Sequence, residues 1–255
     1  MDVGSIQINQ LDFNRARKRK PMLISVRIPA LLFVALVMLL PIPLSAYEHG
    51  ASATQSMTLY VVRHGQTDWN LEGRIQGDTD NPLNATGISQ AEEVATQLGP
   101  IQIDQIYPSA LMRAIQTAEA IAAGIDAPVT PDARLNERSR GIYEGRVANE
   151  VRAEFQPRFE ALDDDMDGGE SLLSISERVG EFTRELVSKH MGQTVMVVGH
   201  SGVNPLVIAE LIDLPPERAI AEIRQGNDEV YKLVVSPEGT VSIWKLIPVT
   251  ALDQL

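Results

Sequence analysis

The stretch LYVVRHGQTDWN at residues 59–70 decides the fold class of this chain. Residues 59–62 form a short apolar run, which is typical of a strand buried on both faces of a sheet. The run ends abruptly in Arg63, His64 and Gly65, where a charged, a titratable and a flexible residue follow one another. We therefore interpret residues 58–63 as a buried strand whose carboxyl end carries functional side chains.

A second stretch, MVVGHSG at residues 196–202, repeats this arrangement. Here an apolar strand over 194–199 is followed at once by His200, again with glycine nearby. In open α/β sheets, ligands bind beyond the carboxyl ends of the strands. The pattern predicts that His64 and His200 face one crevice although 136 positions separate them in the sequence.

Strand and helix patterns alternate along the rest of the chain. Further strands are expected at 103–109, 229–235 and 241–246, and helices at 88–99, 111–124, 177–190 and 205–214. Gly99 and Gly124 are placed to end the first two helices. This alternation predicts an α/β fold, a three-layer sandwich with a mostly parallel central sheet flanked by helices.

Composition excludes several classes of protein. The chain has 255 residues, a formal net charge of −12 and no cysteine. The negative charge argues against a nucleic-acid partner. The absence of cysteine excludes thiol nucleophiles, disulfides and thiolate metal sites. The length suits one ordinary domain with a sizeable core.

The N-terminal region differs from the remainder in composition. A basic cluster at 15–20 precedes the apolar stretch 28–46, which ends in small residues. This order is typical of a secretory signal peptide, and an uncleaved membrane anchor is the alternative. We expect residues 1–46 to be this leader, 47–56 a tether and 57–250 the working domain, exported to the periplasm or secreted. Translation from Met22 would shorten the leader.

The residues at the first strand end suit the chemistry of phosphate. Arg63 offers a planar fork of donors that matches phosphate oxygens. Gly65 lets the backbone turn and an anion approach. A neutral imidazole such as that of His64 is a competent nucleophile toward phosphorus. The expected partner is a small phosphorylated molecule.

Four further segments make the assignment much more specific. RHGQTDWN is followed in order by GRIQGDTDNPLNATG, SALMRAIQTAE, LNERSRGIYEG and VVGHSG. Together they resemble the histidine phosphatase superfamily, in the branch that includes cofactor-dependent phosphoglycerate mutases and small broad-specificity phosphatases. The resemblance extends over about 57–246.

The resemblance implies roles for six residues. His64 matches the nucleophile that becomes phosphohistidine, and Glu137 matches the general acid that protonates the leaving oxygen. Arg63, Asn70, Arg113 and His200 match the residues that bind the phosphoryl group. We expect His200 to be protonated, so that it and the two arginines stabilise the oxygens of the transferred group. Neither a metal nor a cofactor is implied.

Four other arginines, Arg74, Arg138, Arg140 and Arg146, are candidates for substrate contact. Taken singly, each is expected to form a surface salt bridge instead. The acidic run at 163–169 is expected to be a solvated loop.

Two other activities have partial signals in the sequence. Gly199 and Ser201 imitate a serine-hydrolase elbow, but Val203 replaces its last glycine and no histidine follows His200, as that hydrolase order requires. The acidic stretches at 78–80 and 163–165 suggest a magnesium or aspartyl-phosphate site, yet neither directly follows an apolar strand.

Within the resembling family, the choice lies between a phosphatase and a phosphoglycerate-mutase-type transferase. Mutases of the family have a longer, basic segment after the acid glutamate, whereas residues 147–176 are short and contain DDDMDGGES. This favours a metal-independent phosphomonoesterase. A phosphate-binding protein without catalysis is a third possibility, which the presence of every expected catalytic residue disfavours.

Overall fold

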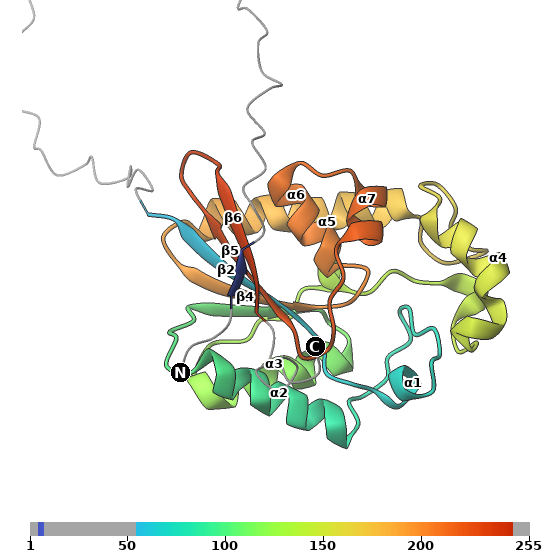
Figure 1. Cartoon of the computed structure of the whole chain (residues 1–255), viewed down its shortest axis with the longest axis horizontal. Helices are drawn as coiled ribbons and strands as arrows, with labels where there is room; N and C mark the ends of the chain where they lie inside the picture. Colours follow the sequence, from blue (N-terminus) through green and yellow to red (C-terminus); the bar gives the residue numbers. More distant parts are fainter. Residues whose placement is uncertain (1–4, 8–54, 247–255) are drawn as a thin grey trace, which may run out of the picture. The chain divides into compact units, whose positions relative to one another are not determined.

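The computed structural model describes residues 5–7 and 55–246 and shows a central sheet between two layers of helices (Figure 1). Most of the expected leader and tether lies outside these residues, since only 5–7 of the leader and 55–56 of the tether are described. The sheet order is β1-β6-β5-β2-β4-β3. Its strands are Ser5–Gln7 (β1), Met57–Arg63 (β2), Gln105–Pro108 (β3), Thr194–Gly199 (β4), Val230–Val235 (β5) and Val241–Leu246 (β6).

The sheet is mixed. The strands β2, β3 and β4 run parallel, as the sequence predicted, with β2 and β3 on either side of β4. The strands β5 and β6 form a hairpin around the turn at 236–239, and β5 pairs antiparallel with β2. A tight turn reverses the chain, so the second strand of a hairpin must run antiparallel. The prediction of an α/β sandwich is confirmed, with fewer parallel pairs than expected.

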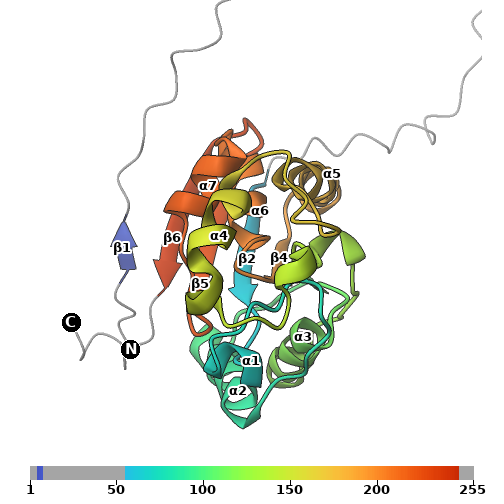
Figure 2. The ribbon, with the colours of Figure 1, turned by 90° about the vertical axis from the view of Figure 1, so that its right-hand side faces the viewer.

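Two layers of helices cover the sheet (Figures 1 and 2). One layer contains Ala85–Leu98 (α2) and Met112–Ile125 (α3), and the other contains Leu172–His190 (α5), Asn204–Ile212 (α6) and Pro216–Glu222 (α7). Alternate residues of β2 point to opposite layers, as the pleat requires. Tyr60 and Val62 pack in the core with α2 and α3, whereas Leu59 and Val61 pack with α5, α6 and α7.

Most helix boundaries lie within three residues of those expected, but α5 begins at Leu172, five residues before the expected start, because Ser171 caps its first turn. Gly99 ends α2 with a positive φ of 60°, as expected. Gly124 does not end α3, which continues to Ile125 and closes at Asp126, a residue in the left-handed region. A Cβ on Gly124 would lie 3.1 Å from the Cβ of Ala95 in α2. The glycine therefore serves the close packing of the two helices.

Two helices near the pocket were not predicted. Asp68–Leu71 (α1) is a single turn capped by Thr67, and Ala148–Glu160 (α4) contains Pro157 and buries only Val151. Neither has the broad apolar stripe that makes a helix recognisable in a sequence. Short 3-10 turns at Ala133–Leu135 and Gly141–Tyr143 lie on either side of Glu137.

Among the described residues, no helix has the length and apolar character needed to span a bilayer.

Candidate active site

The two expected histidines lie side by side at the ends of neighbouring strands. Arg63 at the end of β2 pairs with Gly199 at the end of β4, so that His64 and His200 follow at the same level. The backbone N–H of His64 donates to the carbonyl of Gly199 at 3.0 Å. The ring centroids of His64 and His200 are 5.1 Å apart. The structure thus brings together the pair that the strand ends predicted.

Hydrogen bonding selects the tautomer of His64. Its Nδ1 lies 2.7 Å from the carbonyl oxygen of Gly65. A carbonyl can only accept, so Nδ1 carries the proton and Nε2 keeps its lone pair. Burial, followed by the charges of Arg63 and Arg113, holds the pKa of His64 well below its usual value. The ring is therefore a neutral nucleophile at physiological pH.

His200 differs from the expectation of a protonated donor. Arg113 Nε donates to its Nδ1 at 3.3 Å, and its Nε2 lies 2.7 Å from Ser109 Oγ. Because Nδ1 accepts, the ring proton belongs on Nε2 and points to Ser109. Burial, then the charge of Arg113, holds the pKa of His200 well below its usual value. A neutral His200 orients Arg113, and the positive charge comes from the arginines.

The two arginines of the resemblance are buried and held by backbone carbonyls. Arg113 is fully buried near the start of α3, and its Nη1 and Nη2 donate to the carbonyls of Thr79 and Gly77 at 2.7 and 2.8 Å. Arg63 Nη1 donates to the carbonyl of Gln225 at 2.9 Å. Arg63 Nε is buried and has no hydrogen-bond partner among the described residues. Carbonyls orient these cations without neutralising them, which suits the binding of an anion.

Glu137 is held by four donors. Its Oε1 accepts from the backbone N–H of Arg138 at 2.8 Å and from Arg140 Nη2 at 3.3 Å. Its Oε2 accepts from the backbone N–H of Gly202 at 3.0 Å and from Ser201 Oγ at 3.3 Å. A Cβ on Gly202 would lie 2.3 Å from Oε1, so this glycine makes room for the carboxylate. Ser201, which imitated a hydrolase elbow, thus positions Glu137.

One pocket of about 250 Å³ gathers most of these groups. Its lining includes Arg63, His64, Asn70, Arg74, Arg113, Glu137, Arg140, Phe155, Phe159 and Ser201. His200 lies behind Arg113 and is not among the lining residues. Asn70 uses its Oδ1 to accept from Thr67 in the capping box of α1, which leaves its amide NH₂ as the group available to the pocket.

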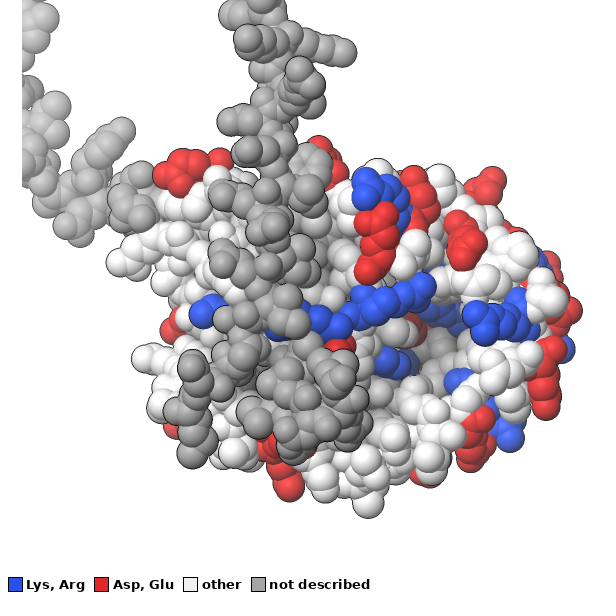
Figure 3. All heavy atoms as spheres, viewed as in Figure 1, with Lys and Arg blue, Asp and Glu red and all other residues white. Residues whose placement is uncertain are grey.

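The pocket is rich in positive charge although the chain is acidic. Four arginines and a single carboxylate, Glu137, line it. A second pocket of about 370 Å³ shares Arg63 and Ser201 with the first and adds Arg224 and Lys245. In Figure 3, Lys and Arg side chains cross the middle of the visible face, while acidic side chains are scattered around them. The cations needed to bind an anion are therefore concentrated locally.

The surface prediction was wrong for two of the four additional arginines. Arg138 is 1% exposed and donates to the carbonyls of Phe159, Asp164 and Glu170. Arg140 is 6% exposed and lines the pocket. Sequence alone gave no signal for this, because both residues lie in an irregular segment with no periodicity. Arg74 and Arg146 do form exposed ion pairs, with Glu72 and Glu154, and Arg74 also reaches the pocket rim.

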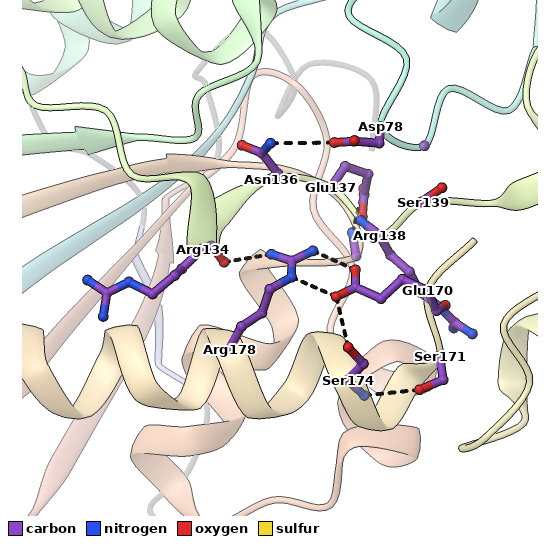
Figure 4. Close-up of polar contacts among 12 residues, drawn as sticks. Asp78, Arg134, Asn136, Glu137, Arg138, Ser139, Glu170, Ser171, Ser174 and Arg178 are labelled. Atoms are coloured by element: carbon purple, nitrogen blue, oxygen red, sulfur yellow. Dashed lines mark hydrogen bonds and ion pairs between the residues drawn. The ribbon is translucent and has the colours of Figure 1, made fainter. Parts of the chain in front are cut away.

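A polar network fixes the segment that carries Glu137 (Figure 4). Arg178 on α5 donates to both carboxylate oxygens of Glu170 at 2.7 and 2.6 Å and to the carbonyl of Arg134 at 2.6 Å. Arg138 Nε donates to the carbonyl of Glu170 at 2.7 Å. Glu170 is thus tied to both ends of the segment 134–138. The sequence did not reveal this role.

The aspartates at 78–80 have structural partners. Asp80 Oδ1 accepts from the backbone N–H of Met112 at 2.6 Å at the start of α3, and Asp78 accepts from Asn136 at 3.4 Å. The acidic run at 163–169 is a loop, as expected, although Asp164 pairs with Arg158 and Met166 is buried.

Gly65 is required by close packing. A Cβ at Gly65 would lie 2.3 Å from the carbonyl oxygen of Gly87 in α2, and its backbone N–H donates to Thr117 Oγ1 at 3.0 Å. The sequence predicted a turn and an approaching anion here. The structure adds a neighbouring backbone as the reason for glycine.

Comparison with known proteins assigns the family. Residues 59–245 match the model of the histidine phosphatase superfamily, branch 1, and the chain belongs to this superfamily. The family that the sequence motifs resembled is thereby confirmed.

Individual relatives carry both phosphatase and mutase-like names. Over 196 residues, the chain is 36% identical to phosphoglycerate mutase-like protein 4 of Arabidopsis thaliana, covering 73% of this chain and 84% of that protein. The α-ribazole phosphatase of Shigella flexneri superposes with a TM-score of 0.64 at 29% identity, over 74% of this chain and 96% of that one. The phosphoserine phosphatase of Entamoeba histolytica superposes with a TM-score of 0.64 at 29% identity, over 73% of this chain and 94% of that one.

Proposed function

We propose that this chain is a phosphomonoester hydrolase that works through a phosphohistidine at His64, without a metal ion. The observation that carries the proposal is the tautomer of His64. Its Nδ1 is committed to the Gly65 carbonyl, so the lone pair on Nε2 is available within a pocket lined by Arg63 and Arg113. The structures of two named phosphatases that resemble the chain support the same activity.

The first step transfers the phosphoryl group to His64. The Nε2 lone pair forms a bond to phosphorus while the bond from phosphorus to the ester oxygen breaks. The electron pair of that bond goes to the alcohol oxygen, which takes a proton from Glu137. Arg63 and Arg113 stabilise the charge on the phosphoryl oxygens, which is the main demand of phosphoryl transfer.

The second step hydrolyses the phosphohistidine. Glu137, now a carboxylate, takes a proton from a water molecule whose oxygen attacks phosphorus. The bond from nitrogen to phosphorus breaks, its electron pair returns to Nε2, and inorganic phosphate leaves. Glu137 has regained its proton, so the cycle closes.

Release of phosphate tests this function. Purified chain starting at Ser52 would be assayed with an excess of chelator on an aryl phosphate and on sugar, nucleotide and amino-acid phosphates. We expect release that resists the chelator and is lost in His64→Ala. Denaturation in alkali during turnover should capture an acid-labile phosphate on His64, detectable by mass spectrometry. Absence of release from every ester by the unmodified chain would overturn the proposal.

A mutase is the second candidate, because the Arabidopsis relative carries a mutase-like name. The short segment at 147–176, which forms α4 and an acidic loop, favours the hydrolase. Incubation with 3-phosphoglycerate separates the two activities. Formation of 2-phosphoglycerate faster than inorganic phosphate would identify a transferase.

We further propose that the chain is exported, on the strength of the basic, apolar and small residues within 1–46. Fractionation of cells that make the full chain, with N-terminal sequencing of the product, tests this. A full-length product in the cytoplasm would contradict it.

A further inference from the structure

One buried guanidinium group in the pocket has donors that the protein does not use. Arg140 is 6% exposed, and its Nη1 is buried with no hydrogen-bond partner within residues 55–246. Its Nη2 makes one long contact, 3.3 Å, to Oε1 of Glu137. A buried charged donor without a partner is costly, so a protein retains one where a ligand supplies the partner.

An aromatic wall holds Arg140 in place. Its guanidinium carbon lies 4.5 Å from the centre of the Phe159 ring. Phe155 stacks on Phe159 with ring centroids 5.5 Å apart, and both rings line the same pocket as Arg140. These apolar rings strengthen charge interactions beside them. Burial lowers the pKa of Arg140, although the charges of Glu137, Glu144 and Glu170 oppose the shift.

The position of Arg140 indicates which part of the substrate it contacts. Arg63 and Arg113 account for the phosphoryl group beside His64. Glu137 must lie next to the alcohol oxygen, because it protonates that oxygen. Arg140 contacts Glu137 directly and therefore lies on the alcohol side of the pocket.

We propose that Arg140 binds a second anionic group on the alcohol part of the substrate. The inference rests on the proposed phosphatase function. The anion must lie within reach of a guanidinium that also touches Glu137, which places it on the ester carbon or on the next carbon. A carboxylate and a second phosphate share the required chemistry.

Three matched two-carbon esters test the proposal: 2-hydroxyethyl phosphate, phosphoglycolate and ethylene glycol bisphosphate. The alcohol part of 2-hydroxyethyl phosphate is uncharged, and we call this compound the neutral ester. Phosphoglycolate has a carboxylate in its place and ethylene glycol bisphosphate has a second phosphate, and we call these two the anionic esters. In the unmodified chain we expect kcat/KM for at least one of the two anionic esters to exceed that of the neutral ester by about 30-fold or more. Comparing the two identifies the preferred anion.

The variant Arg140→Met keeps an unbranched, apolar stem against Phe159 and removes the guanidinium charge. We expect the ratio of kcat/KM for the preferred anionic ester to that for 2-hydroxyethyl phosphate to fall to within about 3-fold of unity, because the second anion loses its cation. An aryl phosphate, whose leaving group needs no proton, serves as the internal reference in each preparation. Arg146→Met, which removes an exposed cation paired with Glu154, is the matched control and should keep the preference.

Binding gives a second readout. In His64→Ala, which cannot form the phosphohistidine, calorimetry should show tighter binding of the preferred anionic ester than of 2-hydroxyethyl phosphate, and Arg140→Met should abolish the difference. An unaltered preference in Arg140→Met, with aryl phosphate still hydrolysed, would overturn the role of Arg140 and leave the phosphatase function intact. Failure of every ester, aryl phosphate included, in the unmodified chain would overturn both.

Discussion

The rings of His64 and His200 lie 5.1 Å apart and are tilted by 54°, although 136 positions separate the residues in sequence. Two neighbouring parallel strands set this distance, since each histidine is the first residue after its strand. Burial, followed by the charges of Arg113 and Arg63, lowers the pKa of each ring. The site therefore concentrates its positive charge on guanidinium groups and keeps both imidazoles neutral.

This arrangement makes the free energy of unfolding depend on pH. Below about pH 6.5 each of these histidines binds a proton in the unfolded chain, whereas the native rings bind one only at a much lower pH. The unfolded state then holds more protons than the native state, so stability falls as pH falls. Each ring contributes a slope of up to about 1.4 kcal/mol per pH unit.

Urea unfolding between pH 7.5 and pH 5 measures this slope. We expect His64→Asn, which removes one titrating ring, to show a pH dependence shallower by about 1 kcal/mol per unit in the lower part of the range. All other titratable groups are common to both proteins, so the difference in slope arises from the loss of His64. Parallel pH profiles for the two proteins would contradict the neutral state of the native ring.

The role of Glu137 predicts a dependence on the leaving group. In Glu137→Gln the amide cannot donate a carboxylic proton, so hydrolysis of alkyl esters should slow by about 10²–10⁴-fold. Transfer from an aryl phosphate with a stable phenolate needs no proton and should slow far less in a rapid-mixing measurement of the first turnover. An equal loss for both kinds of ester would exclude Glu137 as the acid for the alcohol oxygen.

The contact between Ser109 and His200 predicts a positioning effect. Ser109 is fully buried and accepts the Nε2 proton of His200 at 2.7 Å. Ser109→Ala leaves that donor without a partner, which should cost about 1–3 kcal/mol of stability. His200 would then hold Arg113 less firmly, so KM for phosphate esters should rise.

Ser174→Ala is the matched control, because Ser174 is exposed on α5 and its hydroxyl contacts only Glu170 among the described residues. A stable Ser109→Ala variant with unchanged KM would show that His200 does not depend on this contact.

The strand ends and the order of motifs were sufficient to predict the family, the sandwich and the meeting of His64 with His200. A continuous apolar strand is a strong local signal, and its end fixes where the next side chain lies. The protonation of His200 could not be predicted in the same way. It depends on Arg113, 87 positions away in sequence, and on burial that only the assembled fold creates.

The buried positions of Arg138 and Arg140 were missed for a related reason. Both residues lie between two short 3-10 turns, where neither a period of two nor one of 3.6 marks the inward face. The partners of Arg138, which are the carbonyls of Phe159, Asp164 and Glu170, come from α4 and the loop after it, and Arg140 lies against the ring of Phe159 in the same helix. No residue of α4 offered a pattern from which that contact could be inferred.

The network around Glu170 gives the last prediction. Arg178 links both oxygens of Glu170 to the carbonyl of Arg134, three residues before Glu137 (Figure 4). Arg178→Met should cost about 1–3 kcal/mol of stability, because a half-buried carboxylate loses its bidentate partner. It should also displace Glu137, so hydrolysis of alkyl esters should fall by about 10-fold relative to that of aryl phosphate.

Arg184→Met provides the control on the same helix. Arg184 is 63% exposed by side chain and pairs with Glu210 at 2.7 Å, away from the segment 134–138. Its loss should change neither the alkyl-to-aryl hydrolysis ratio nor the free energy of unfolding by a measurable amount, as is usual for exposed pairs. If Arg178→Met were destabilised yet kept the alkyl-to-aryl ratio of the unmodified chain, the network would support the fold alone. A changed ratio that Glu170→Gln reproduces, without further change in the double variant, would establish that the two residues position Glu137 as one unit.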